Sequence, residues 1–199
     1  MDFATLVRSS RTVRRFKESE PVDAAALEWL VDLARFCPSA GNFQPLKFVL
    51  VNDPAVRERI FPSLAWAGYL SEWPGPVPGE RPAAYIAVLH DKRVAEKVDC
   101  DHGIMAQTIM LGAASRGLGG CILGAVDRKA LAQTLDLPEH LAVLLVLALG
   151  RPAETVAVED VDEPTDRTAI RYWRDDAQVH HVPKRTLNHL IHARYVDHG

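Results

Sequence analysis

A run of basic and hydroxyl side chains near the N-terminus is the first place where this sequence could do chemistry. From Arg8 to Phe16 it holds four arginines and three Ser or Thr residues within nine positions. The planar guanidinium fork fits phosphate or carboxylate oxygens, and hydroxyls add further donors. So many like charges need either a bound anion or a dispersed, solvated face. This stretch alone leaves both interpretations open.

A second basic pair, Lys184 and Arg185, follows Val182-Pro183 near the other end of the chain. The two distant clusters could converge on one phosphate. A nucleic-acid surface is less favoured, because few stacking aromatics accompany the arginines and the formal net charge is -3.

The segment Pro38–Pro45 reads as a loop of small residues with a proline at each end. Small side chains let a flat ligand approach the backbone, and Asn42 and Gln44 offer amide donors and acceptors. A plain connection between a helix and a strand is the alternative.

Other candidate sites are weaker. Asp99 and His102 lie one helical turn apart, as metal ligands can, but no further ligand follows at a matching spacing. His180-His181 would point apart in an extended segment, which favours a structural role. Gly117–Gly120 follows an expected helix, whereas a dinucleotide fingerprint follows a strand. No side chain stands out as a nucleophile or general base, which suits chemistry carried by a bound phosphorylated cofactor.

Alternating helices and strands are expected to position these residues. The helix over 99–116 is apolar nearly all round, so we expect it to be central and buried. The run Leu141–Leu149 should be the most buried strand. Asp23 and Asp127 are expected helix N-caps, and Gly117 a C-cap. The remaining expectations are helices over 2–9, from Asp23 to about Cys37, from Asp53-Pro54 and from Asp127 to about Leu135, with strands over 47–51, 83–89 and 119–126.

Residues 61–82 combine aromatic side chains with five prolines. Such a loop either packs on the core or covers a pocket.

Residues 151–199 hold no long periodic element, yet they are too apolar to dangle in solvent. We therefore expect two parts in the chain. Residues 1–150 would form the core, and residues 151–199 an arm that wraps another surface.

The sequence favours a reducing compartment. Its three cysteines, Cys37, Cys100 and Cys121, are odd in number and share no metal-ligand spacing. The first twenty residues lack a signal-peptide pattern, and the longest apolar run is too short to span a membrane. A cytoplasmic protein without membrane contact is expected.

Four segments, in order along nearly the whole chain, together resemble the FMN-dependent nitroreductase family. Arg11-Thr12-Val13-Arg14 is similar to its N-terminal Arg-Ser-x-Arg motif, and Pro38–Pro45 to its Pro-Ser-x-x-Asn-x-Gln-Pro loop. Gly117–Ala125 is similar to its glycine-rich strand, and Val182–Arg185 to its C-terminal basic pair.

The resemblance implies an α+β fold, a mainly antiparallel sheet flanked by helices around a long central helix. It also implies an intertwined homodimer whose two FMN sites are contacted by both chains, with hydride passing from NADH or NADPH through FMN to a nitroaromatic, quinone or related acceptor. The chemistry would lie on flavin N5, so no side chain is expected to be catalytic. The cofactor-binding residues it implies are Ser10, Arg11, Thr12 and Arg14 along the phosphate and pyrimidine edge, Pro38, Ser39, Ala40 and Asn42 from the other chain, Leu123, Gly124 and Ala125 beside N5, and Lys184 and Arg185 on the phosphate.

Departures from the family pattern at Ser10, Leu46 and Val126 concern the substrate more than the cofactor. Specialised reactions such as dehalogenation or dehydrogenation therefore stay open. So do a flavin-binding sensor or carrier without turnover, and a metal-dependent enzyme using Asp99 and His102.

Overall fold

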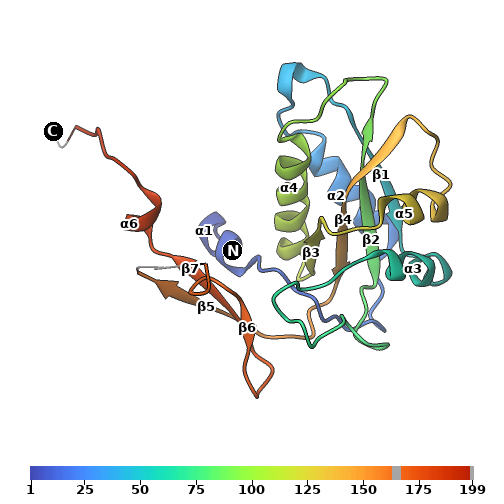
Figure 1. Cartoon of the computed structure of the whole chain (residues 1–199). Helices are drawn as coiled ribbons and strands as arrows, with labels where there is room; N and C mark the ends of the chain where they lie inside the picture. The colour runs from blue at the N-terminus through green and yellow to red at the C-terminus, as the bar shows by residue number, and fades with distance from the viewer. Residues whose placement is uncertain (163–166, 198–199) are drawn as a thin grey trace.

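The computed structural model describes residues 1–162 and 167–197 and has an α+β fold (Figure 1). A four-stranded sheet has the order β1-β2-β4-β3, with every neighbouring pair antiparallel. The predicted fold class is thus confirmed. The strands of this sheet are β1 (Leu46–Val51), β2 (Ala84–Asp91), β3 (Gly119–Leu123) and β4 (Leu141–Gly150).

Helices cover both faces of the sheet. Successive side chains of β2 point to opposite faces, so each face has its own apolar cluster. Ile86 and Val88 pack with α2 and α4, whereas Tyr85 and Leu89 pack with residues of α3, α5 and the 61–82 loop. The helices of the core are α1 (Phe3–Ser9), α2 (Ala24–Ala34), α3 (Pro54–Ile60), α4 (Asp101–Ser115) and α5 (Arg128–Thr134), with short 3₁₀ turns η1 (Ala40–Asn42) and η2 (Phe61–Ser63).

The helix boundaries follow local signals in the sequence. The carboxylates of Asp23 and Asp127 accept hydrogen bonds from the third residue beyond each, at 2.6 and 3.0 Å, as N-caps do. Gly117 follows α4 in a left-handed conformation with φ of 71°, so its predicted role as a C-cap is confirmed.

Two expectations about burial are wrong. The most buried strand is β2, which is buried at every position. It lies between β1 and β4 and is covered on both faces. The predicted strand, β4, is only partly buried over its first half. Helix α4 is buried only on the side that packs against α2 and the sheet. On its other side Ile104 and Leu111 are partly exposed and Gln107 is exposed.

Residues after Gly150 hold more regular structure than the sequence pattern suggested. They form a small three-stranded sheet of order β5-β7-β6, in which β5 and β7 are parallel. This arm lies beside the core, and its final segment extends away from it (Figure 1). Its elements are β5 (Val156–Val161), β6 (Trp173–Arg174), β7 (His180–Arg185) and α6 (Leu187–Leu190).

None of the helices within residues 1–162 and 167–197 combines the length and apolar character needed to cross a bilayer.

Candidate functional site

The basic N-terminal stretch lies along the glycine-rich strand. Thr12 pairs with Gly120 in a parallel bridge, and the backbone N–H of Val13 donates to Gly120 O at 2.8 Å. Gly120 permits this packing, because a Cβ there would lie 2.4 Å from Ala148 O. The contact places the first predicted motif beside the third. A cavity of about 50 Å³ between them is lined by Ser10, Arg11, Thr12, Gln107, Met110, Gly120 and Ile122.

A larger hollow of about 210 Å³ also touches Ile122. It brings Arg14 together with Leu123, Gly124 and Ala125, four of the predicted site residues. Ligand pockets usually measure about 300–1,000 Å³, so this hollow alone is smaller than a typical ligand pocket. The hollow is lined by Arg14, Ala65, Trp66, Ala67, Gly68, Cys121, Ile122, Leu123, Gly124 and Ala125.

The aromatic loop forms one wall of this hollow, as the pocket-covering interpretation of residues 61–82 predicted. The N–H of Ala65 donates to Ala125 O at 3.0 Å, which ties the loop to the end of the glycine-rich strand. Trp66 is buried and stacks on Phe61, with ring centroids 5.9 Å apart. Gly75, at φ of 124°, lets the backbone approach the Trp66 ring, where a Cβ would lie 2.6 Å from Cδ1.

Arg14 is a buried cation at the edge of the hollow, 9% exposed. Its Nη1 lies 3.1 Å from His180 Nε2, its guanidinium carbon lies 4.8 Å from the Tyr172 ring centroid, and its Nε is buried without a partner. No carboxylate of the described chain forms an ion pair with it. The basic stretch is therefore not simply a solvated turn.

Glu154 is the acidic residue nearest to this arrangement, and it is otherwise engaged. Its carboxylate accepts hydrogen bonds from the backbone N–H groups of Arg14 and Arg15 and from Arg174 Nη2 at 2.7 Å. Its side chain is 1% exposed. Nothing in the sequence singled out Glu154, because Arg14 and Arg15, whose backbone it binds, lie about 140 positions away.

The two adjacent histidines of β7 point apart, as predicted for an extended segment. His180 is buried against Arg14; burial, together with the Arg14 charge, lowers its pKa to about 4. His181 lies between Asp175 and Glu159, with N···O distances of 3.2 and 2.5 Å, and stacks on Trp173. Hydrogen bonds to Asp175 and then Glu159 raise the His181 pKa above its ordinary value.

The Pro38–Pro45 loop is fixed by Asp101 at the first turn of α4. The buried Asp101 carboxylate accepts from Ser39 Oγ at 2.5 Å and from the N–H of Ala40 at 3.2 Å. Asn42 is exposed, in a left-handed conformation with φ of 56°. A cavity of about 420 Å³ beside the loop is lined by Ala40, Phe43, Pro45, Ala95, Glu96, Lys97, Val98, Asp99 and Asp101.

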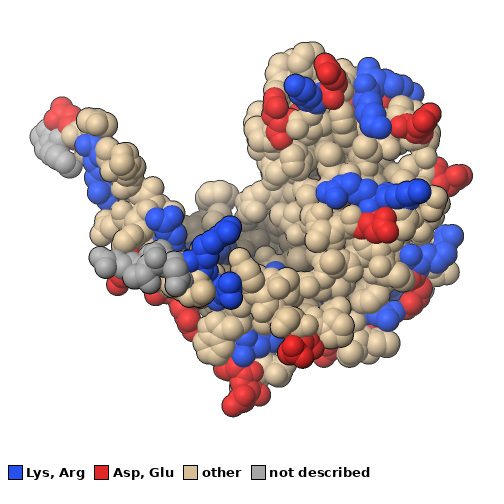
Figure 2. Space-filling model, in the orientation of Figure 1, with Lys and Arg blue, Asp and Glu red and all other residues tan. Residues whose placement is uncertain are grey.

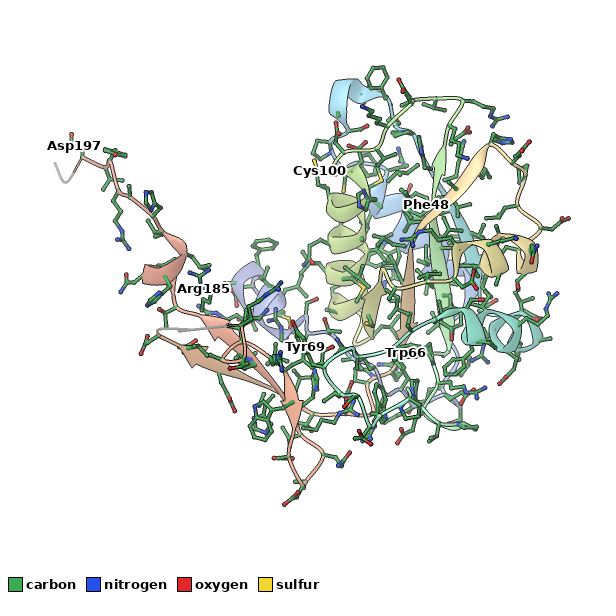
Figure 3. All side chains as sticks on the ribbon, in the orientation of Figure 1. Phe48, Trp66, Tyr69, Cys100, Arg185 and Asp197 are labelled. Carbon is green, nitrogen blue, oxygen red and sulfur yellow. The ribbon has the colours of Figure 1, made fainter. Side chains whose placement is uncertain are left out.

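Within one chain this loop packs on the first turn of α4 and shares no lining residue with the Arg14 hollow. Figure 3 shows Cys100, just before α4, and Trp66, at the wall of the hollow, in separate parts of the core. The structure thus does not join Pro38, Ser39, Ala40 and Asn42 to the other predicted residues inside one protomer.

The C-terminal basic pair lies on β7 of the arm. Lys184 and Arg185 are exposed, and Arg185 Nη2 donates to His189 O at 2.9 Å. Arg11 uses its guanidinium on the end of α1, donating to Val7 O at 2.8 Å. No hydrogen bond or ion pair among the described residues joins Arg11 to the pair. Figure 2 shows Lys and Arg side chains gathered beside the recess, where α1 and the arm overlap in this view.

The metal alternative at Asp99 and His102 gains no further ligand. Across 1–162 and 167–197, no three His, Cys, Asp or Glu side chains are placed to hold a metal ion.

Comparison with known proteins gives a consistent result. Residues 7–151 match the model of the nitroreductase family. The chain is 27% identical over 190 residues to a putative NADH dehydrogenase/NAD(P)H nitroreductase of Methanothermobacter thermautotrophicus, covering 87% of this chain and 88% of that protein. It is 28% identical to a 5,6-dimethylbenzimidazole synthase of Rhodospirillum rubrum, covering 76% and 82%. An FMN-dependent nitroreductase of Clostridium difficile has the same fold, with a TM-score of 0.64 at 19% identity over 76% of this chain and 88% of that one.

Asp101→Ala should lower the free energy of unfolding by about 1.5–3 kcal/mol, because hydrogen bonds to a charged group are lost and Ser39 and Ala40 lose their shared acceptor. Asp99→Ala is the matched control: Asp99 is exposed on the neighbouring turn, so its loss should change stability by at most about 0.5 kcal/mol. Urea unfolding measures both variants, and limited proteolysis should find residues 38–45 cut faster only in Asp101→Ala. Equal stability of the two variants would contradict the anchoring role.

Proposed function

Because the chain belongs to the nitroreductase family, we propose that it is an FMN-dependent oxidoreductase that passes hydride from NADH or NADPH through the flavin to a small acceptor such as a nitroaromatic or a quinone. The observation that carries the proposal is the hollow that joins the buried Arg14, which has no carboxylate partner among the described residues, to Leu123, Gly124 and Ala125. A buried guanidinium without a counter-ion is costly, so the site is built for an electron-rich group.

The residues present fit a flavin. Arg14 would face the pyrimidine edge with its free donors, and Leu123, Gly124 and Ala125 would lie beside the reacting part of the ring. Ser10, Arg11 and Thr12, around the adjoining cavity, would hold the phosphate. When bound, the flavin supplies the capacity to accept hydride and release electrons.

The chain contributes position, charge and exclusion of water rather than an acid or base. Among the residues that line the hollow, Arg14 and Cys121 are the ionisable ones. Burial raises the pKa of the Cys121 thiol, which keeps it protonated and unreactive. Trp66 and its loop cover one side of the hollow, which strengthens the field of Arg14 by keeping water away.

A homodimer completes the proposal. The residues Pro38, Ser39, Ala40 and Asn42 would come from the second chain, which accounts for their distance from Arg14 within one protomer. Lys184 and Arg185 would close on the phosphate. The surface that a second chain would cover is apolar and includes one side of α4 and these exposed residues: Phe3, Ile122, Leu187, Leu190 and Val196.

We extend the proposal to the two parts of the chain and to the cellular compartment of the protein. Residues 1–150 form the flavin-binding core, and residues 151–199 the arm that reaches the partner. The three cysteines are free thiols, which supports a cytoplasmic location because thiols persist in a reducing compartment.

A specialised reaction is the second candidate, favoured by the similarity to a protein named 5,6-dimethylbenzimidazole synthase. Such a protein would keep the flavin and differ in its acceptor.

The purified protein should carry a flavin that is released as FMN on denaturation, because the charged cluster and the hollow select a phosphorylated flavin. It should oxidise NADH or NADPH in the presence of a nitroaromatic or a quinone. Absorption spectroscopy and a coupled turnover assay measure both properties. A colourless protein that binds no added FMN would refute the proposal, whereas bound FMN without turnover would favour a sensor, a carrier or the specialised reaction.

Arg11→Ala, Lys184→Ala and Arg185→Ala should weaken FMN binding by about 10- to 150-fold, because a charge-assisted hydrogen bond contributes about 1.5–3 kcal/mol. Riboflavin lacks the phosphate, so its weaker binding should hardly change. Pairing Arg11→Ala with either of the others should be non-additive, since both contacts share one group. Titration with FMN and riboflavin measures these affinities. An equal loss of affinity for both flavins would mean that the residues act on folding, and no loss would mean that the phosphate binds elsewhere.

Leu187→Glu should raise the dissociation constant of the dimer, because it puts a charge into the apolar surface assigned to the partner. Asn188→Glu adds the same charge to the same short helix on an exposed polar residue and should leave association unchanged. Sedimentation at several protein concentrations measures both. A wild-type monomer, or equal association of the two variants, would contradict the wrapping arm.

A further inference from the structure

His180 fixes the direction of the Arg14 guanidinium. The two side chains meet through Arg14 Nη1 and His180 Nε2, 3.1 Å apart. Every nitrogen of a guanidinium is a donor, so His180 Nε2 must be the acceptor and the imidazole must be neutral, with its proton on Nδ1. His180 is 1% exposed, so water cannot substitute for it.

The surroundings leave the Arg14 charge uncompensated. The carboxylate of Glu154 is occupied by two backbone N–H groups and by Arg174, so the nearby negative charge is balanced by a different arginine. Tyr172 offers only the face of its ring to Arg14. A carboxylate at position 180 would neutralise Arg14, whereas a neutral imidazole orients it and keeps its charge available to the hollow.

We propose that His180 is a positioning residue for the flavin: it accepts a hydrogen bond from Arg14, which holds the guanidinium at the hollow beside Leu123–Ala125 with its positive charge free. The inference rests on the proposed function. Because His180 begins β7, the inference makes this strand of the arm part of the flavin site of its own chain. Any contact of the arm with a partner chain would be additional. A positive charge held at this edge stabilises reduced, anionic flavin more than oxidised flavin.

Titration of His180 would dismantle this arrangement. The groups that face it are Arg14, Tyr172, Glu154 and Arg174, of which the two arginines repel a second positive charge; the adjacent His181, which points away, adds to that repulsion when protonated. Its pKa falls from about 6.5 to about 4 on folding, so the unfolded chain binds the proton more readily. The contribution of His180 to stability is therefore complete above about pH 6.5 and declines as the pH falls toward 4.

Three variants test the role. In His180→Leu the acceptor is lost, so the affinity for FMN and for riboflavin should fall by a similar factor, about tenfold, because Arg14 acts on the ring rather than on the phosphate. The flavin midpoint potential should shift to more negative values. His180→Gln can present an amide oxygen to Arg14, so both properties should stay near those of the wild type. His181→Gln, one position along and facing away, is the matched control and should leave the potential unchanged.

Stability against pH supplies a readout that does not need flavin. Between pH 6.5 and 4.5 the wild type should lose more unfolding free energy than His180→Gln, which cannot titrate at that position. This comparison decides the matter if His180→Leu fails to fold: parallel pH profiles would overturn the neutral-acceptor role.

The outcomes separate this inference from the proposed function. If the wild type binds no flavin, both fail together. If it binds and turns over normally while His180→Leu keeps the wild-type potential and riboflavin affinity, only the positioning role is overturned. The same holds if His180→Gln loses as much as His180→Leu, since the effect would then come from shape rather than from the accepted hydrogen bond.

Discussion

The buried carboxylate of Glu154 is the constraint on which the site depends. It accepts the backbone N–H groups of Arg14 and Arg15 and the side chain of Arg174, which joins the N-terminal segment, the end of β4 and the arm at one point. Burying this carboxylate with fewer partners would cost free energy, so we expect the three segments to associate cooperatively. Phe16, fully buried against Gly150, reinforces the same junction. Arg14 can then lie beside β3 without a counter-ion of its own, and the proposed flavin site is built on that arrangement.

Local signals predicted most of the core. Aspartates at helix starts, Gly117 at a helix end and short apolar runs each specify structure through contacts within a few residues, and these expectations agree with the elements found. Burial was harder to predict, because it depends on strand order: β2 is covered on both faces since it lies between β1 and β4, which its composition does not reveal. The arm was misjudged for a related reason. Its strands β5 and β7 pair in parallel across a long connection, so no short-range turn announces that pairing, and β6, which pairs antiparallel with β7, is only two residues long.

The site divides in the same way. Arg14 and Leu123–Ala125 were found from motifs and do meet at one hollow, and the aromatic loop was identified by its composition. His180 was seen only as a structural residue and Glu154 was missed, because their roles arise from contacts more than 130 positions apart. The loop with Ser39 and Asn42 shows the limit within one protomer. Its own geometry is well determined by Asp101, yet within the chain it shares no lining residue with the hollow.

The long sequence separation between Arg14 and His180 has a consequence for biosynthesis. Their contact spans 166 positions and the backbone contact with Glu154 spans 140, so the first residues of the site leave the ribosome well before their partners are made. At translation rates of roughly 5–20 residues per second this interval is on the order of 10 s. The core strands and helices have their own partners by then, whereas the arginine-rich segment still lacks its carboxylate. The nascent chain thus acquires the partners of its core elements first and the partners of Arg14 last, so the proposed cofactor site is complete only when synthesis is almost finished.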